Sequence, residues 1–148
     1  MINKLFTAIA VSLICVSGAA VAADDVYYRQ TEASYFLTSS PGTPQTILSL
    51  TVPAGTWVIT AKANPVNFSQ PDFARCTILV GGTQYDGGAT FIGGSPSAAV
   101  AEIMLQTVVT TTAQKVVQLQ CQHDYATSGI YLDPYASIVV VKSAAPIG

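Results

Sequence analysis

The sequence predicts an all-β protein: a single-domain antiparallel β-sandwich or jelly roll of about eight or nine strands, preceded by a cleaved signal peptide. Two observations favour this fold. From Tyr27 onward, apolar and polar residues alternate in one run after another, which is the two-residue period of a strand with one buried face. Turns that contain proline or glycine separate these runs, and the runs are rich in β-branched residues.

The N-terminal segment, residues 1–22, has the features of a secretory signal peptide. A single lysine precedes an apolar run at Leu5–Val16, and small residues then lead to a cleavage site after Ala22 or Ala23. The apolar run is too short to span a bilayer, and no second run is long enough, so we expect no transmembrane segment. Residues 23–148 should form one exported domain, in the periplasm, outside the cell or at the cell surface. The short, alanine-rich signal is typical of bacteria.

The first half of the mature chain predicts four strands. Residues 26–45 contain two short ones followed by a turn, and the runs ILSLTV (47–52) and TWVITAKA (56–63) each alternate strictly. Between these runs, PAGT (53–56) carries a turn signal, so the pair forms either a hairpin or a tight corner. The side chains expected to face the core are Leu48, Leu50, Val52, Trp57, Ile59, Ala61 and Ala63.

The second half predicts further strands within residues 74–82, 98–112, 114–122 and 129–143. The segment 98–112 has residues that favour a helix, but it ends in the β-branched run VVTTT, which favours the strand that we predict. Near the C-terminus, ASIVVVKS (136–143) carries apolar residues on both faces, as a central or interface-covered strand would.

Gly-Gly pairs recur at residues 81–82, 87–88 and 93–94. Short glycine repeats also occur in β-helical solenoids, and the calcium-binding kind needs an aspartate in each copy. Here only the first copy has one, Asp86, and three short copies cannot build a solenoid core. We therefore interpret the glycines as hairpin turns and a flexible loop, where glycine adopts positive φ at no steric cost.

Charged residues make up 9% of the chain, against about 25% in a typical soluble domain, and the formal net charge is −2. The few basic residues form no patch suited to nucleic acid or to anionic lipid. A lightly charged surface has two explanations. Part of it is buried in an oligomer, or it reflects the usual composition of extracellular β proteins, and composition does not separate the two.

Two of the three cysteines, Cys76 and Cys121, lie outside the signal segment. Cys76 is in phase with Ile78, and Cys121 is in phase with Leu119, so both sulfur atoms should face the core. Two inward cysteines in an exported chain predict a disulfide. A reactive thiol would need a polar, partly exposed setting, which these apolar runs do not provide.

His123 and Asp124 follow Cys121 closely and raise the question of a nucleophilic or metal site. Adjacent strand residues point to opposite faces, so the two should not converge unless the strand has ended. Zinc needs three or four ligands, and the chain has no second histidine. We expect a solvated His123 at a strand end, and we assign no catalytic, cofactor-binding or metal-ligating residue and no cofactor.

Enzyme chemistry has little support in the sequence. A Ser-His-Asp hydrolase of the common type would carry a G-x-S-x-G motif, which is missing. A glycosidase needs two carboxylates, and nothing in the spacing of the available ones brings a pair together. A small hydrolase built on paired carboxylates is therefore our third hypothesis, with the candidates Asp86, Glu102, Asp124 and Asp133.

Aromatic residues lie near chain ends and strand ends. An exposed tyrosine combines an apolar ring with a polar tip, which suits sugar or protein binding, but tyrosine is also simply a good strand residue. We expect a structural role for most of them. Our second hypothesis, a carbohydrate-binding module, would use those in loops: Tyr27, Tyr28, Tyr35, Phe36, Tyr125, Tyr131 and Tyr135 are the candidates.

Four segments together resemble a group of bacterial secreted or surface domains: LTVPAGTWVITAKAN (50–64), CTILVGG (76–82), VVQLQC (116–121) and ASIVVVK (136–142). Their plan is similar to jelly rolls of the C1q/TNF-like type. The resemblance implies a jelly roll and a homotrimer, and it implies no catalytic residue. Our leading hypothesis is thus an exported, non-enzymatic module that is structural, self-assembling or protein-binding. Its contacts would be sheet faces rich in Thr and Val, and its partner a protein or a glycan rather than nucleic acid.

The signal peptide and the disulfide give the first testable prediction. The exported protein, purified without reductant, should begin at Ala23 or Asp24 and weigh two hydrogens less than its reduced form. Intact-mass spectrometry before and after reduction measures both. Ready alkylation of Cys121 in the native protein would contradict the disulfide.

Overall fold

The structure is a computed structural model that describes residues 25–38, 42–93, 99–125 and 129–143. In these ranges the regular elements are strands, and the strand pairs are antiparallel. The predicted signal peptide, residues 1–22, lies outside the described residues, so it stays a prediction. The described residues contain no helix long and apolar enough to cross a membrane.

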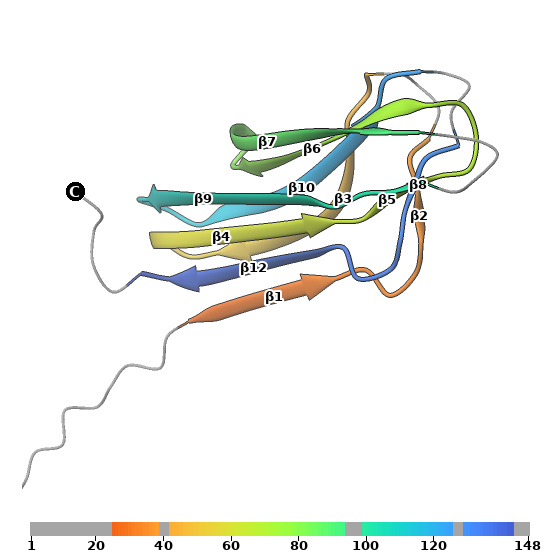
Figure 1. Cartoon of the computed structure of the whole chain (residues 1–148). Coiled ribbons are helices and arrows are strands. Elements are labelled where there is room, and N and C mark those ends of the chain that lie inside the picture. Colours follow the sequence, from red (N-terminus) through yellow and green to blue (C-terminus); the bar gives the residue numbers. More distant parts are fainter. Residues whose placement is uncertain (1–24, 39–41, 94–98, 126–128, 144–148) are drawn as a thin grey trace, which may run out of the picture.

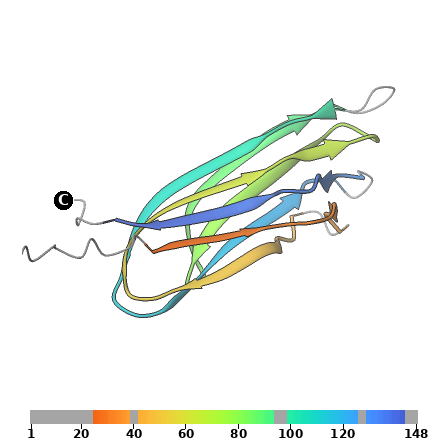
Figure 2. The same cartoon turned by 90° about the horizontal axis from the view of Figure 1, so that it is seen from below.

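Two four-stranded sheets make up the sandwich (Figure 1). The first contains, from edge to edge, β1 (Val26–Gln30), β12 (Ser137–Lys142), β4 (Gly55–Ala63) and β9 (Ile103–Thr111). The second contains β3 (Gln45–Val52), β10 (Lys115–His123), β6 (Asp72–Val80) and β7 (Thr83–Ile92). Figure 2 shows that the axes of the long strands in both layers are roughly aligned with one another, as in an aligned sandwich.

Four short strands gather at one end of the sandwich (Figure 1). Their order is β2 (Tyr35–Phe36), β11 (Tyr131–Leu132), β5 (Pro65–Asn67) and β8 (Ala99–Val100). At two or three residues each, they are too short to show an alternation in the sequence, which is why the prediction of eight or nine strands does not include them all.

The pairing of the long strands is that of a jelly roll. The first long strand pairs with the last (β1 with β12), the second with the second last (β3 with β10), and so on inward through β4 with β9 to β6 with β7. The chain is thus one long hairpin, wrapped so that its pairs alternate between the two sheets. The predicted fold class is confirmed.

The core lies between the two sheets and follows the predicted alternation. Trp57 and Ile59 are fully buried on β4, and Val117 and Leu119 are fully buried on β10 of the facing sheet. Of the side chains predicted to face inward, all are buried except Leu50, which is half-buried and packs at the margin of the core.

The segment PAGT (53–56) is a corner rather than a hairpin. It joins β3 of the second sheet to β4 of the first. The indole Nε1 of Trp57 donates a hydrogen bond to the Pro53 carbonyl oxygen at 3.1 Å, which fixes the corner to the largest core side chain. Gly55 lies beside this indole ring and has a φ of 154°. A Cβ atom on Gly55 would lie 3.4 Å from the ring atoms of Trp57.

The Gly-Gly pairs have different roles. Gly81 and Gly82 form the turn between β6 and β7, with φ values of 59° and 84°, as predicted for a hairpin turn. Gly87 and Gly88 do not form a turn or a loop, because they lie inside β7. A Cβ on Gly88 would come within 3.2 Å of the Ile103 and Leu105 side chains, so this glycine allows β9 to pack closely against β7.

The segment 98–112, whose first residues also favour a helix, contains no helix in its described part, residues 99–112. It forms β8 and then β9, whose nine residues alternate between the core and the surface. The prediction of a strand is confirmed: the β-branched residues at the end of the segment outweigh the helix-favouring residues at its start.

The hairpin turn gives a second prediction. Gly82→Ala should destabilise the fold by about 1–2 kcal/mol, because an alanine is forced to positive φ although it has open space. Gly93→Ala is the matched control. It also meets open space, but its φ is not positive, so it should be neutral or slightly stabilising. Urea unfolding of both variants measures the difference, and equal midpoints would contradict the role of the turn.

Candidate functional site

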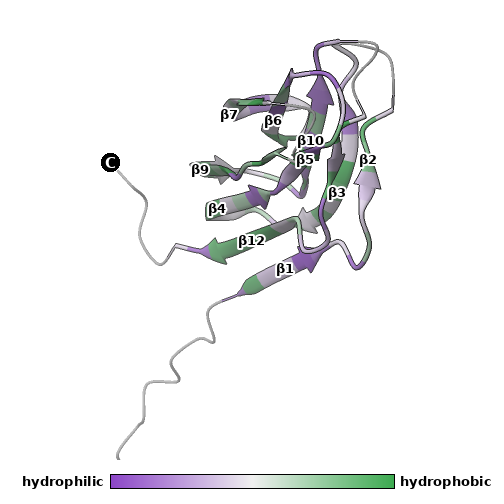
Figure 3. Cartoon of the chain, turned by 45° about the vertical axis from the view of Figure 1, so that its right-hand side comes forward, coloured by the Kyte–Doolittle hydropathy of each residue, from purple (hydrophilic) through white to green (hydrophobic). Residues whose placement is uncertain are grey.

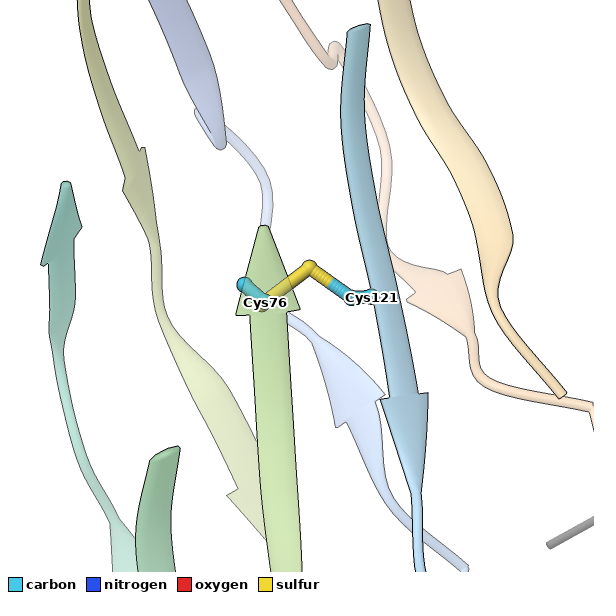
Figure 4. The surroundings of a disulfide bond; sticks show 2 residues. All are labelled: Cys76 and Cys121. Carbon is cyan, nitrogen blue, oxygen red and sulfur yellow. A yellow bond between two sulfur atoms is a disulfide. The ribbon is translucent and has the colours of Figure 1, made fainter. Parts of the chain in front are cut away.

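Cys76 and Cys121 occupy directly opposed positions on β6 and β10, and a disulfide joins them (Figure 4). Both residues are buried, and their Cα atoms lie 4.1 Å apart. The bond therefore links two neighbouring central strands of the second sheet. It leaves no thiol at this position for nucleophilic or metal chemistry.

His123 is not solvated, which corrects the prediction. It is 1% exposed at the end of β10, and its Nδ1 lies 3.0 Å from the Oδ2 atom of the fully buried Asp72, on β6. The carboxylate of Asp72 also accepts hydrogen bonds from the backbone N–H groups of Asp124 and Tyr125, at 3.2 and 3.1 Å. This buried pair holds the chain as it leaves β10, and buried polar groups of this kind require such partners.

Asp124 points away from His123, as the alternation predicted. Its carboxylate accepts hydrogen bonds from Nε and Nη2 of Arg75, on the outer face of β6, at 2.8 and 2.6 Å. The charge and hydrogen bonds of Asp124 raise the pKa of Arg75 above its ordinary value. The pair is partly exposed, so it positions the two side chains more than it stabilises the fold.

The other candidate carboxylates lie at separate places in the fold. Asp86 accepts backbone hydrogen bonds from Gly87 and Gln106, both at 2.8 Å, and so links β7 to β9. Glu102 is exposed between β8 and β9, and Asp133 follows β11. Within the described ranges, no group of three or more His, Cys, Asp or Glu residues could hold a metal ion.

The candidate tyrosines do not form one surface. Tyr27 packs edge-on against Trp57, with ring centroids 5.5 Å apart, and is structural. Tyr131 lies between Phe36 and Phe68 at the end of the sandwich, with centroid distances of 5.5 and 6.0 Å. The sequence reasoning did not include Phe68, which is exposed there.

A row of valines crosses the outer face of the first sheet. In the strand register, Val26 lies opposite Val141, Val141 opposite Val58, and Val58 opposite Val108. Opposed residues of antiparallel strands point to the same face, so the four side chains form one continuous line across the sheet. Val26 and Val108 are 59% and 42% exposed, and the two central valines are half-buried by their neighbours.

The next two rows extend this surface, which we call the valine face. They are Tyr28, Val139, Thr60 and Gln106, followed by Gln30, Ser137, Lys62 and Met104. Lys62 is the one charged residue of the three rows. Figure 3 shows β12 as apolar along most of its length, which fits the predicted strand with apolar residues on both faces. Exposed apolar side chains that adjoin one another in this way are a candidate contact surface.

Sequence comparison identifies no relative: no protein-family model matches the chain, and no curated protein matches it. Solved structures do share its fold. A chain of infectious bursal disease virus, Gt strain, matches with a TM-score of 0.59 at 15% identity, over 93% of this chain and 38% of that chain. For the Gx strain the values are 0.56, 13%, 83% and 33%. Dimeric latent PorU from Porphyromonas gingivalis matches with 0.52 at 11% identity, over 80% and 12%.

These matches confirm a β-sandwich. The chain spans little more than a third of the virus chains and a smaller part of PorU, and identities this low show the fold alone. Function must therefore be argued from the surfaces of this chain.

The buried pair gives a third prediction. Asp72→Ala should destabilise the protein by about 3–5 kcal/mol, because it removes the carboxylate that contacts the buried imidazole of His123 and accepts hydrogen bonds from three backbone N–H groups, those of Phe73, Asp124 and Tyr125. Arg75→Ala, which breaks the partly exposed pair with Asp124, should cost about 1 kcal/mol or less. Urea unfolding monitored by Trp57 fluorescence compares the two, and equal losses would contradict this difference.

Proposed function

We propose that the protein is an exported, non-enzymatic β-sandwich module that associates with further copies of itself through the valine face. The observation that carries the proposal is the row of four valines that runs across all strands of the first sheet. Export rests on the signal-peptide features of residues 1–22, and a disulfide between buried cysteines suits an oxidising compartment.

The energetics favour contact between two such faces. A valine side chain that goes from half exposed to buried contributes about 1 kcal/mol. The row supplies two such valines at its ends, Val26 and Val108, and the half-buried Val58 and Val141 add less. Tyr28 and Met104, at 59% and 56% exposed, add longer side chains in the next two rows, at opposite edges of the sheet. Sheets that pack face to face through β-branched residues have the same arrangement as the core of a sandwich.

Charge favours a second copy of this chain as the partner. Two identical faces repel when each carries several charges of one sign, but the valine face carries only Lys62, at its margin. A strongly charged partner would find no complementary groups there. The low content of charged residues was compatible with burial in an oligomer or with the usual composition of extracellular β proteins. Self-association through the valine face favours the first explanation. The resemblance to C1q/TNF-like jelly rolls makes a trimer the expected assembly.

The fourth prediction uses two valines with the same exposure on opposite sheets. Val108→Glu, on the valine face, should raise the dissociation constant of self-association by at least about 100-fold, because it buries an unpaired carboxylate. Val108 is 42% exposed, and Val116, on β10 of the second sheet, is 43% exposed. Val116→Glu should therefore leave self-association unchanged.

Analytical ultracentrifugation of the mature protein over a wide range of concentrations measures the association and gives the copy number. A wild-type protein that stays monomeric at the highest concentration would refute the proposal. If the two variants raised the dissociation constant of self-association equally, the interface would not be the valine face.

A further inference from the structure

The outer face of the second sheet differs from the valine face. It carries an open hollow of about 590 Å³ over β10, β6 and β7. Three rows of outward residues run across these strands at the hollow: Gln122, Arg75 and Ala89; Gln120, Thr77 and Gly87; and Gln118, Leu79 and Gln84. All but Gln118 line the hollow. The face therefore presents amide side chains from β10 and from β7, on the two sides of β6.

Gly87 creates the hollow, together with a β-bulge. A Cβ on Gly87 would lie 2.9 Å from the amide nitrogen of Gln84 and 3.2 Å from Thr77, so any side chain here would fill the space. The register shifts by one residue between Ile78 and Leu79, which brings Gln84 rather than Tyr85 opposite Leu79. The bulge thus directs an amide, and not an aromatic ring, toward the gap left by the glycine.

The three glutamines of the lining can both donate and accept hydrogen bonds, and they carry no charge. Each glutamine amide offers two donors and one carbonyl acceptor, which matches the hydroxyl groups of a sugar. Gln120 is held in place by a hydrogen bond from its Nε2 to the Thr46 hydroxyl, at 3.1 Å. Arg75 is the one charged residue of the lining, and its Nε and Nη2 atoms already donate hydrogen bonds to the carboxylate of Asp124. A phosphate or carboxylate ligand would compete with that carboxylate for the guanidinium.

An aromatic pair continues the same face past Arg75. Phe73 and Phe91 are opposed in register, with ring centroids 5.0 Å apart, and Phe91 is 57% exposed. The Arg75 guanidinium lies 5.3 Å from the centroid of the Phe73 ring, which holds both groups in position. An exposed ring beside a row of amides offers an apolar surface to the C–H face of a sugar ring, while the amides reach its hydroxyl groups.

We propose that this hollow is a binding site for a neutral oligosaccharide. The amides of Gln84, Gln120 and Gln122 bind its hydroxyl groups, and Phe91 stacks against one sugar ring. The site is independent of self-association, because it lies on the opposite sheet from the valine face. It also differs from the loop tyrosines that the sequence suggested, which the structure disperses.

Titration calorimetry with the intact mature protein tests the site. The probes are neutral hexasaccharides of glucose, xylose, mannose and galactose, with hexagalacturonate as the charged counterpart. We expect binding of at least one neutral probe and none of hexagalacturonate. Gln122→Ala and Gly87→Val should each weaken that binding at least tenfold, the first by removing hydrogen bonds and the second by filling the hollow.

The control is Gln106→Ala, which removes an exposed amide from the valine face and should leave sugar binding unchanged. Far-UV circular dichroism and the urea midpoint establish that each variant is folded. If Gly87→Val does not fold, the test rests on the affinity of Gln122→Ala for the sugar. The proposal is overturned if no neutral probe binds, if only hexagalacturonate binds, or if binding survives Gln122→Ala. Each of these results is separate from the ultracentrifugation of the wild-type protein, so the two proposals can fail independently.

Discussion

The burial of one face of every long strand between two sheets is the constraint on which the rest of the structure depends. Trp57, Ile59, Val117 and Leu119 are fully buried because their strands turn these side chains toward a common core. Since the side chains of a strand alternate, the same packing forces the remaining residues outward. The core thus defines two outer faces, and the two surfaces to which we assign functions are these faces.

The two outer faces have opposite chemistry although their backbones are alike. The first sheet presents five valines among uncharged side chains and a single lysine, which favours contact with another apolar surface. The second presents glutamines, a matched Arg75–Asp124 pair and a gap at Gly87, which favours a small polar ligand. One module would then have one face for assembly and another for ligand binding, so that association of several copies would multiply the binding sites and raise avidity.

The central strands of the ligand-binding face are held together by more than backbone hydrogen bonds. The disulfide joins β6 to β10 within the core, and Asp72 and His123 pair near the ends of the same two strands. Both links lie beneath the rows that line the hollow. They keep Arg75 and Gln122, which are opposed in register, at a fixed separation. A preorganised surface loses less conformational entropy when a ligand binds.

The sequence by itself determined the all-β class, the long strands other than β7, the inward direction of Cys76 and Cys121 and the opposite directions of His123 and Asp124. These follow from a two-residue alternation, which is a local property of the chain. The strands β5 and β7 and the burial of His123 were not predicted. The short strands β8 and β11 were not distinguished from the longer strands that follow them. Asp72 lies two residues before the segment that was predicted as a strand, 74–82, so the sequence reasoning neither placed it nor gave it a partner.

Only the tertiary structure decided which outward residues become neighbours. The valine row joins strands that lie as far apart in the chain as β1 and β12, and its alignment depends on the register of three separate pairings. The hollow depends on a bulge that shifts β7 by one residue and so exchanges Tyr85 for Gln84 opposite Leu79. Register and bulges are set by contacts between distant segments, and no pattern within one strand encodes them.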